Sequence, residues 1–213
     1  IFSYAVSNPV ISNCLFYDNE SDRGGALAFY EYGNGILINN TIADNTALYG
    51  GGLYFYDQSD PEIINNILWN NEASTSGPQV YFSTMASYPG FYYNDIEEGL
   101  EGFGGNVPAL DYLFNIEEDP MFEDNEDFPY INAEIYSPCI NQGSPDSSSW
   151  YYGDSLPTEC LCGADRHMEN RIDIGCYERL KVIDNIETVD QINSMNIIPN
   201  PVITTALLQY DLE

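Results

Sequence analysis

The chain has 213 residues, of which 34 are Asp or Glu and only 5 are Lys or Arg, so its formal net charge at pH 7 is −29. Such an acidic surface repels the phosphates of nucleic acids and the headgroups of anionic membranes, and it attracts cations. No apolar run approaches the length of a membrane span. We therefore expect no nucleic-acid partner and no membrane span.

A repeat with a period of 26 residues organises the first half of the chain, as seen in residues 8–19, 34–45 and 60–71. Each unit holds short apolar, β-branched or aromatic runs separated by Gly, Asn, Asp and Ser, which predicts two or three short strands joined by turns. A single unit cannot bury a core. Successive units must stack, with adjacent strands about 4.8 Å apart. The pattern predicts an all-β solenoid, a parallel β-helix. Residues 1–4 fall at a second-strand position, so we expect a signal and earlier coils upstream.

Identical residues one period apart are expected to stack as ladders from coil to coil. The ladder residues are Asn13, Asn39 and Asn65 and, next to them, Cys14, Asn40 and Asn66. A buried column of amides forms hydrogen bonds between coils, whereas a single buried Asn is costly. We favour the second ladder inside, together with Phe16, Ile42 and Leu68, although alternation along the strand leaves the parity open.

The repeats carry a family resemblance. Phe-Tyr-Asp-Asn at residues 16–19, followed by Gly-Gly-Ala-Leu at residues 24–27, resembles the FxxN and GGA[ILV] pair of polymorphic outer-membrane-protein repeats and of other right-handed parallel β-helices. The later coils replace the Phe by Ile42 and Leu68. The resemblance covers residues 1–120 and implies a right-handed parallel β-helix. It does not specify a function, because the same scaffold carries adhesins, lyases and hydrolases.

An aromatic strip follows the second strand of the units. Tyr4, Tyr30, Tyr56 and Phe82 recur at the 26-residue period, and Tyr54 belongs to the adjacent position of the same parity. On an outer face these rings would stack on sugars or pack against a partner. The alternative is that loops of the same chain cover the strip, or that it forms a second wall of the core, since Tyr is an ordinary strand former.

Acidic residues are densest between Asp95 and Asp127, and this run contains one candidate cation site. Asp124, Asn125 and Asp127 offer oxygen ligands that suit Ca²⁺, but the stretch lacks the ligand spacing and the closing Glu of an EF-hand loop. Ca²⁺ is therefore the candidate cofactor. The alternative explanation of the acid excess is solubility in a salty or extracellular setting.

Two stretches near the end of the repeats resemble the C-terminal part of secreted β-helix proteins with an "SPCI-N-G-P" and "DIGAYE" signature. They are Ser-Pro-Cys-Ile-Asn-Gln-Gly-Ser-Pro at residues 137–145 and Asp-Ile-Gly-Cys-Tyr-Glu at residues 173–178. The resemblance implies that residues 121–179 finish and cap the solenoid. An open strand edge requires such a cap.

Four cysteines lie in this expected cap, and an even number in a loop-rich region of a secreted chain predicts two disulfides. Cys160 and Cys162 are close in sequence, so we expect each to pair with Cys139 or Cys176, in either combination. Zinc binding is the alternative, but Cys-Leu-Cys lacks the usual two-residue gap. Cys14 is then a buried free thiol.

Residues 180–195 predict a polar linker, and residues 196–213 resemble the "YPNP…I.Y.L" opening of a type IX secretion C-terminal sorting domain. The matching residues are Pro199, Asn200, Pro201, Tyr210 and Leu212, while Ile198 stands where Tyr is usual. The resemblance implies export by the type IX machinery across a Gram-negative outer membrane. Ser155, in Asp-Ser-Leu, also resembles an O-glycosylation site of bacteria that use this system.

The coils offer few groups for catalysis. Polysaccharide lyases of this fold resemble one another in pairing Ca²⁺ with a Lys or Arg base, and residues 1–120 contain only Arg23. Asp18 and Asp44 are one period apart and would suit a retaining glycosidase, but Asp-Asn after a strand is ordinary turn chemistry. We interpret His167, the single histidine, as a surface or capping residue.

These observations favour a secreted or surface-displayed scaffold, without a catalytic site in this stretch, that contacts a glycan, a cell-surface protein or copies of itself. One alternative is the C-terminal part of a carbohydrate-active enzyme, a polysaccharide lyase or glycosidase with its active site upstream. Another is the subunit of an extracellular filament, because strand edges can add further strands.

Overall fold

The computed structural model describes residues 1–123, 130–131, 137–144, 158–166, 171–178, 192–199 and 206–212. The chain divides into two compact units, Ile1–Leu180 and Lys181–Glu213. In the second unit, β20 (Ile192–Pro199) and β21 (Ala206–Leu212) form an antiparallel hairpin. β20 begins within residues 180–195, which the sequence predicts as linker.

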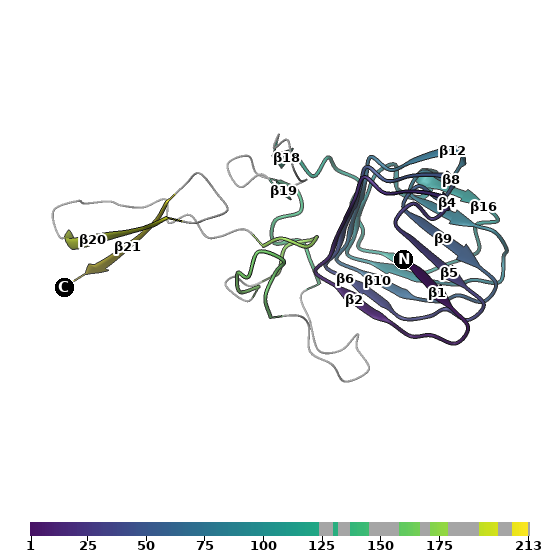
Figure 1. Ribbon diagram of the computed structural model, residues 1–213, viewed down its shortest axis with the longest axis horizontal. Helices are drawn as coiled ribbons and strands as arrows, with labels where there is room; N and C mark the ends of the chain where they lie inside the picture. Colours follow the sequence, from purple (N-terminus) through teal and green to yellow (C-terminus); the bar gives the residue numbers. More distant parts are fainter. Residues whose placement is uncertain are drawn as a thin grey trace. The chain divides into compact units, whose positions relative to one another are not determined.

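The first unit is a parallel β-helix, and a complete coil contributes one short strand to each of four sheets (Figure 1). Sheet A contains β1 (Phe2–Tyr4), β5 (Leu27–Tyr30), β9 (Leu53–Tyr56), β13 (Val80–Phe82) and β16 (Phe103–Gly105). Sheet B contains β2 (Val10–Ser12), β6 (Ile36–Ile38), β10 (Glu62–Ile64), β14 (Gly90–Tyr92) and β17 (Tyr112–Leu113). Sheet C contains β3 (Leu15–Tyr17), β7 (Thr41–Ala43), β11 (Ile67–Trp69) and β15 (Asp95–Ile96). Sheet D contains β4 (Glu20–Arg23), β8 (Thr46–Tyr49) and β12 (Glu72–Ser76).

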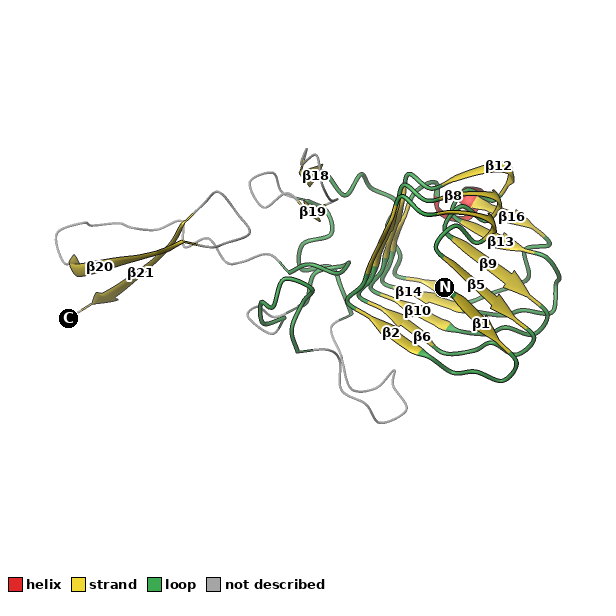
Figure 2. Ribbon diagram, viewed as in Figure 1, coloured by secondary structure: helices red, strands yellow, loops and turns green. Residues whose placement is uncertain are grey.

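Short non-solenoid elements complete the first unit. The 3-10 helix η1 (Gly99–Gly102) takes the place of a sheet D strand in the last full coil (Figure 2). β18 (Phe122–Glu123) pairs antiparallel with β19 (Tyr130–Ile131). The sequence predicts only two or three strands per coil, and sheet D is the one it misses. Its strands are polar and largely exposed, so backbone pairing rather than an alternating apolar pattern defines them.

Register follows the repeat except at one bulge. β12 contains a register shift against β8. The extra residue lengthens the step from β9 to β13 to 27 residues, so Phe82 pairs with Phe55 rather than with Tyr56. Phe82 is therefore fully buried, which corrects its predicted place in the aromatic strip. Tyr81 occupies the outward position instead.

The interior of the coils is apolar. Phe29, Phe55 and Phe82 stack from coil to coil, with ring centroids 5.5 and 5.3 Å apart. The same cluster contains Leu27, Leu37, Ile42, Leu53, Ile63, Leu68, Val80, Phe91 and Ile96. Burying one such side chain contributes about 1.5–3 kcal/mol. The stack supplies the core that a single coil lacks.

One amide ladder lies at the inner corner between sheets B and C. Asn40 Nδ2 donates to Asn66 Oδ1 at 2.9 Å, Asn66 to Asn94 at 3.1 Å and Asn94 to Asn115 at 2.9 Å. In the first coil Cys14 takes this position, and its backbone N–H donates to Asn40 Oδ1 at 2.9 Å. Its thiol is free, as predicted, but half-buried rather than buried. Each amide therefore satisfies its neighbour, and the column compensates for burying polar groups.

A second amide ladder comes from the Asn of the FxxN motif. Asn19 Nδ2 donates to Asn45 Oδ1 at 2.8 Å, Asn45 to Asn71 at 2.9 Å, and Asn71 to Gln79 at 2.7 Å. The residue before each ladder Asn has a positive φ, which Asn and Asp tolerate better than other side chains. In the first row these residues are Asn13 (before Cys14), Asn39, Asn65, Tyr93 and Phe114, and in the second row they are Asp18, Asp44 and Asn70.

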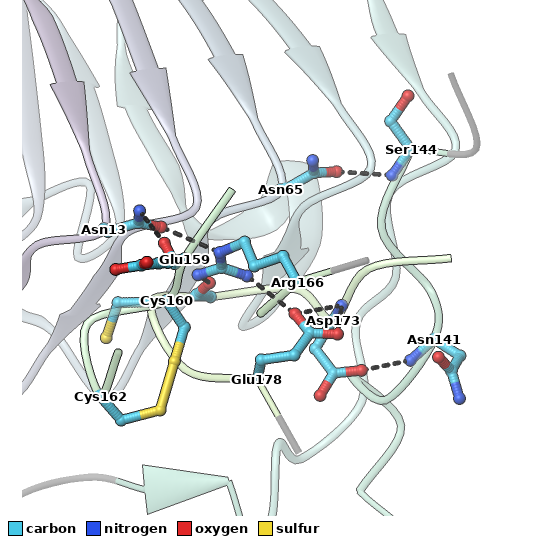
Figure 3. Close-up of polar contacts among 12 residues, drawn as sticks. Asn13, Asn65, Asn141, Ser144, Glu159, Cys160, Cys162, Arg166, Asp173 and Glu178 are labelled. Carbon is cyan, nitrogen blue, oxygen red and sulfur yellow. Dashed lines mark hydrogen bonds and ion pairs between the residues drawn. A yellow bond between two sulfur atoms is a disulfide. The ribbon is translucent and has the colours of Figure 1, made fainter. Parts of the chain in front are cut away.

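The residues expected to cap the solenoid contact its side. We call residues 137–144, 158–166 and 171–178 the flanking segment. In the first coil Asn13 Nδ2 donates to the carbonyl of Glu159 at 2.6 Å. In the third coil Asn65 Oδ1 accepts a hydrogen bond from the backbone of Ser144 at 2.7 Å (Figure 3).

This segment therefore fastens successive coils along the corner between sheets B and C, whereas the sequence predicts a cap over the end. The strongest tie is Arg166, whose side chain is fully buried. Its guanidinium donates to Asn13 Oδ1 at 3.0 Å and to the carbonyl of Gly175 at 2.8 Å, and it forms an ion pair of 3.1 Å with Glu178 (Figure 3).

The cysteines of this segment pair differently from the prediction. Cys160 and Cys162 form a disulfide with each other, their Cα atoms 5.3 Å apart, and Cys139 and Cys176 are buried free thiols. The predicted pairing of the first two with the last two is wrong. The free thiols face the solenoid, where Cys139 Sγ donates to Asp95 Oδ2 at 3.0 Å, whereas the disulfide closes a separate turn.

Candidate functional site

The outer surface of sheet A and its edge toward sheet D carry a continuous group of aromatic rings. We call these rings the aromatic face; they are Phe2, Tyr4, Tyr30, Tyr49, Tyr54, Tyr56 and Tyr81. They lie outward because their strand neighbours, such as Phe29 and Phe55, point into the core. The face is thus not a second wall of the core.

The rings contact one another from coil to coil. Tyr30 stacks on Tyr54 with centroids 5.4 Å apart, and Tyr54 stacks on Tyr81 at 5.6 Å. Tyr56 lies 5.2 Å from Tyr30, and Tyr49 lies 4.9 Å from Tyr81. Such contacts hold the rings in fixed orientations and stabilise each pair by about 0.5–1.5 kcal/mol.

The face is open to solvent at its edges and denser at its centre. Phe2 is 62% exposed and Tyr4 51%, whereas the side chains around it leave Tyr54 only 3% exposed. Tyr30 and Tyr56 are half-buried. The flanking segment lies on the other side of the coils from β1, β5 and β9 (Figure 1). Within the described residues, this segment does not cover the face.

Arg23, the last residue of β4, lies against these rings. Its Nη1 donates to the hydroxyl of Tyr30 at 3.2 Å, and its guanidinium carbon is 5.8 Å from the centre of the Tyr54 ring. The hydrogen bond to Tyr30 raises the pKa of Arg23, and burial raises the pKa of Tyr54. The guanidinium is thus a fixed positive charge on an otherwise acidic protein.

The structure places Tyr4, Tyr30, Tyr54 and Tyr56 together on this face, as the predicted strip requires, and it removes Phe82. Sequence reasoning missed Tyr49, Tyr81 and Arg23. Tyr81 had a signal: Val-Tyr-Phe at residues 80–82 aligns with Leu-Tyr-Phe at residues 53–55, which gives the observed step of 27. Tyr49 and Arg23 had none, because strands β4 and β8 were not expected.

A second cluster lies under the flanking segment. The carboxyl of Asp95 is fully buried, accepting hydrogen bonds from the Cys139 thiol at 3.0 Å and from the backbone of Glu118 at 3.2 Å. Burial raises the pKa of Asp95 to about 7, and Glu118 and Asp119 add to the rise. Burial and the same Asp95 raise the pKa of Cys139, so the pair is neutral at acidic pH. Its location between segment and coils indicates a structural role.

The acid pair considered for glycoside hydrolysis lies in turns. Asp18 and Asp44 have φ values of 54° and 56° at the corner between sheets C and D, and the Asp44 carboxylate accepts a hydrogen bond from Asn70. A turn with positive φ favours Asp or Asn at both positions, so these residues are explained by turn chemistry, as the sequence analysis predicts.

Several predicted residues lie outside the described part of the chain. They are the Ca²⁺ candidates Asp124, Asn125 and Asp127, the glycosylation candidate Ser155, and His167. Within the described residues, His, Cys, Asp and Glu side chains form no group of three that could hold a metal ion. The described residues also contain no helix that is long and apolar enough to cross a membrane.

Comparison with known families gives one result. Residues 1–103 match the model of the right handed beta helix region. Together with the parallel sheets, this match identifies the coils of the first unit as a right-handed parallel β-helix, as the repeats predict. No curated protein and no solved structure gives a significant match to the chain. The right-handed β-helix carries adhesins as well as carbohydrate-active enzymes, so the fold alone assigns no activity.

Proposed function

We propose that this chain is part of a secreted or cell-surface scaffold with an adhesin-like role, and that it binds glycan chains through the aromatic face. The observation that carries the proposal is the continuity of the face. Its rings touch across successive coils on the outer surface of sheet A and are not covered by the described flanking segment. Uncovered aromatic surface of this kind marks an interaction site.

Spacing favours an extended glycan as the occupant. Rings on adjacent coils are 5.2–5.6 Å apart, so they form an unbroken row across successive coils. A glycan that runs parallel to the solenoid axis would therefore meet a tyrosine at several successive coils. Because neighbouring rings stack on one another, much of each ring face is already in contact, and the hydroxyl-bearing edges remain for hydrogen bonds with sugar hydroxyls.

The charge of the chain and its C-terminal sequence support an extracellular setting. A net charge of −29 disfavours nucleic acids and anionic membranes as partners. The resemblance of residues 196–213 to a type IX sorting domain supports export to the surface of a Gram-negative bacterium. Ca²⁺ bound by acidic residues would act as a structural cation in that setting.

The proposal is tested on a glycan array with purified chain, in Ca²⁺ and in chelator, comparing the wild type with Tyr30→Ala/Tyr56→Ala. The double substitution should weaken binding at least about tenfold, because two ring contacts are lost. Tyr17→Ala/Tyr88→Ala is the matched control, since both tyrosines are exposed and neither belongs to the aromatic face.

Equal weakening in the control pair, or the absence of any glycan bound by the wild type, would overturn glycan binding at this face. Loss of binding in chelator alone would support a role for Ca²⁺. Retained binding in chelator would restrict recognition to the side chains of the aromatic face.

A further inference from the structure

Arg23 is the one Lys or Arg side chain of the coils, and it lies on the aromatic face. Residues 1–165 contain no other Lys or Arg, although the chain has 34 acidic residues. In spite of this excess, no carboxylate of the described residues lies at ion-pair distance from Arg23. The ion pair found among those residues joins Arg166 to Glu178. Its side chain is exposed and is held by Tyr30 and Tyr54 instead.

The tyrosines orient this guanidinium without using up its donors. One hydrogen bond joins Nη1 to Tyr30, and the Tyr54 ring attracts the cation at 5.8 Å. The rest of the planar fork of N–H donors is left for a ligand. Such a fork matches the two oxygens of a carboxylate, which Lys matches less well.

We propose that the aromatic face, through Arg23, selects glycans whose sugar rings carry an anionic substituent of the uronate type. This inference rests on the proposed glycan binding and adds the class of sugar. The tyrosine hydroxyls would contact the ring hydroxyls, while the guanidinium pairs with the carboxylate of one sugar. The anionic group would meet the one Lys or Arg side chain of residues 1–165.

The acidity of the chain does not prevent this contact. Salt screens the repulsion between an anionic glycan and the wider acidic surface beyond about 8 Å at physiological ionic strength. Besides Tyr30, Asp22, the neighbour of Arg23 in β4, raises the pKa of Arg23, so the guanidinium keeps its charge. A charge-assisted hydrogen bond to the exposed Arg23 guanidinium acts at contact distance, where salt screens it least. The hydrogen bond to Arg23 therefore decides which sugar is preferred.

The test is isothermal titration of the full chain at physiological salt with three oligosaccharides of equal length. These are β-linked glucose, β-linked glucuronate and sulfated β-linked glucose. The wild type should bind glucuronate about three- to fivefold more tightly than glucose, because an exposed ion pair contributes only a modest gain. Arg23→Gln should abolish this preference without weakening glucose binding, and Arg23→Lys should keep part of it.

Arg171→Gln is the matched control. Arg171 also lies 5.8 Å from a tyrosine ring, that of Tyr93, but in the flanking segment, so its loss removes the same charge away from the aromatic face. This variant should keep the full preference for glucuronate. Equal gain with the sulfated chain would show that Arg23 selects anionic sugars in general, and gain with glucuronate alone would assign the carboxylate.

Two outcomes would overturn the inference while glycan binding still holds. One is equal wild-type affinity for glucose and glucuronate. The other is an Arg23→Gln variant that loses both ligands equally, which would make Arg23 only a support for the tyrosines. Failure of the proposed function is distinct: the wild type would bind none of the three chains.

Discussion

Two faces of the same coils differ in the side chains that they turn outward. On sheet B, Ile36, Ile38 and Ile64 are only 8%, 1% and 1% exposed, because Ile172 of the flanking segment packs on them. On sheet A, the outward positions carry tyrosines, and Tyr4 is 51% exposed. The covered face on sheet B therefore carries aliphatic side chains, and the open face on sheet A carries tyrosine rings.

The physical reason lies in what each side chain tolerates. An aliphatic ladder gains free energy only when apolar surface leaves water, at about 25 cal/mol per Å². A tyrosine has an apolar ring and a polar tip, so it is stable half-buried. We therefore expect substitutions on the covered face to change the stability of the fold, and substitutions on the open face to change binding.

The largest effect is expected from Arg166→Met at the covered corner. The substitution leaves the buried Glu178 carboxylate, Asn13 Oδ1 and the carbonyl of Gly175 without their partner. The free energy of unfolding should fall by about 3–5 kcal/mol in urea denaturation. Arg171→Met, which removes a less buried guanidinium from the same segment, should cost about 1 kcal/mol. Equal losses would contradict the role given to burial.

A pH effect should follow from Asp95. Its pKa rises from 3.8 to about 7 in the folded chain, so the folded state binds more protons than the unfolded state between these values. The stabilisation is therefore complete below pH 4 and is lost as the pH rises toward 7, by up to roughly 3–4 kcal/mol. Urea denaturation between pH 4 and 8 checks this. Asp95→Asn, which keeps the carboxamide neutral, should flatten the slope, and an unchanged slope would assign it to other acids.

A smaller effect should separate Ile64→Ala from Tyr56→Ala. Ile64 is 1% exposed beneath the flanking segment, and its truncation should cost about 2–4 kcal/mol in thermal or urea unfolding. Tyr56 is half-buried on the open face, and its truncation should cost about 1 kcal/mol. A loss at Tyr56 as large as that at Ile64 would show that the aromatic face is part of the folding core.

The smallest effect is expected from the disulfide. Joining Cys160 to Cys162 closes a very short loop, so Cys160→Ser/Cys162→Ser should lower the free energy of unfolding by about 1–2 kcal/mol. Peptide mapping of the unreduced chain by mass spectrometry checks the pairing itself. A bridge from either residue to Cys139 or Cys176 would restore the pairing predicted from the sequence.

Periodicity was sufficient to predict the coils, because each ladder depends on residues that repeat along the chain. Asn40 and Asn66 recur at the period and form hydrogen bonds with each other in the interior. The inward side of the strands could not be derived from alternation, since both parities are mixed. The structure decides it: Asn40 and Asn66 hydrogen-bond to each other inside, whereas Asn13 and Asn65 contact the flanking segment.

The candidate site was predicted in part. Tyr30 and Tyr56 follow from the repeat, but Phe82 and Tyr81 exchange roles because a bulge in β12 adds one residue to the step. The bulge leaves no fixed signal in the polar strand itself, and its only trace in the sequence is the alignment of residues 80–82 with residues 53–55. Arg23 joins the face only because sheet D brings the end of β4 beside β5 and β9.

The sequence by itself determined that this chain stacks 26-residue coils into a parallel β-helix, with Asn and Asp at the turns and aromatic residues on one strand. These are local and periodic properties, and every coil repeats them. Only the tertiary structure decided which corner the flanking segment covers, how the cysteines pair and which rings remain open. Those features depend on contacts between residues far apart in the chain, such as Asn13 with Arg166, for which no repeat supplies a pattern.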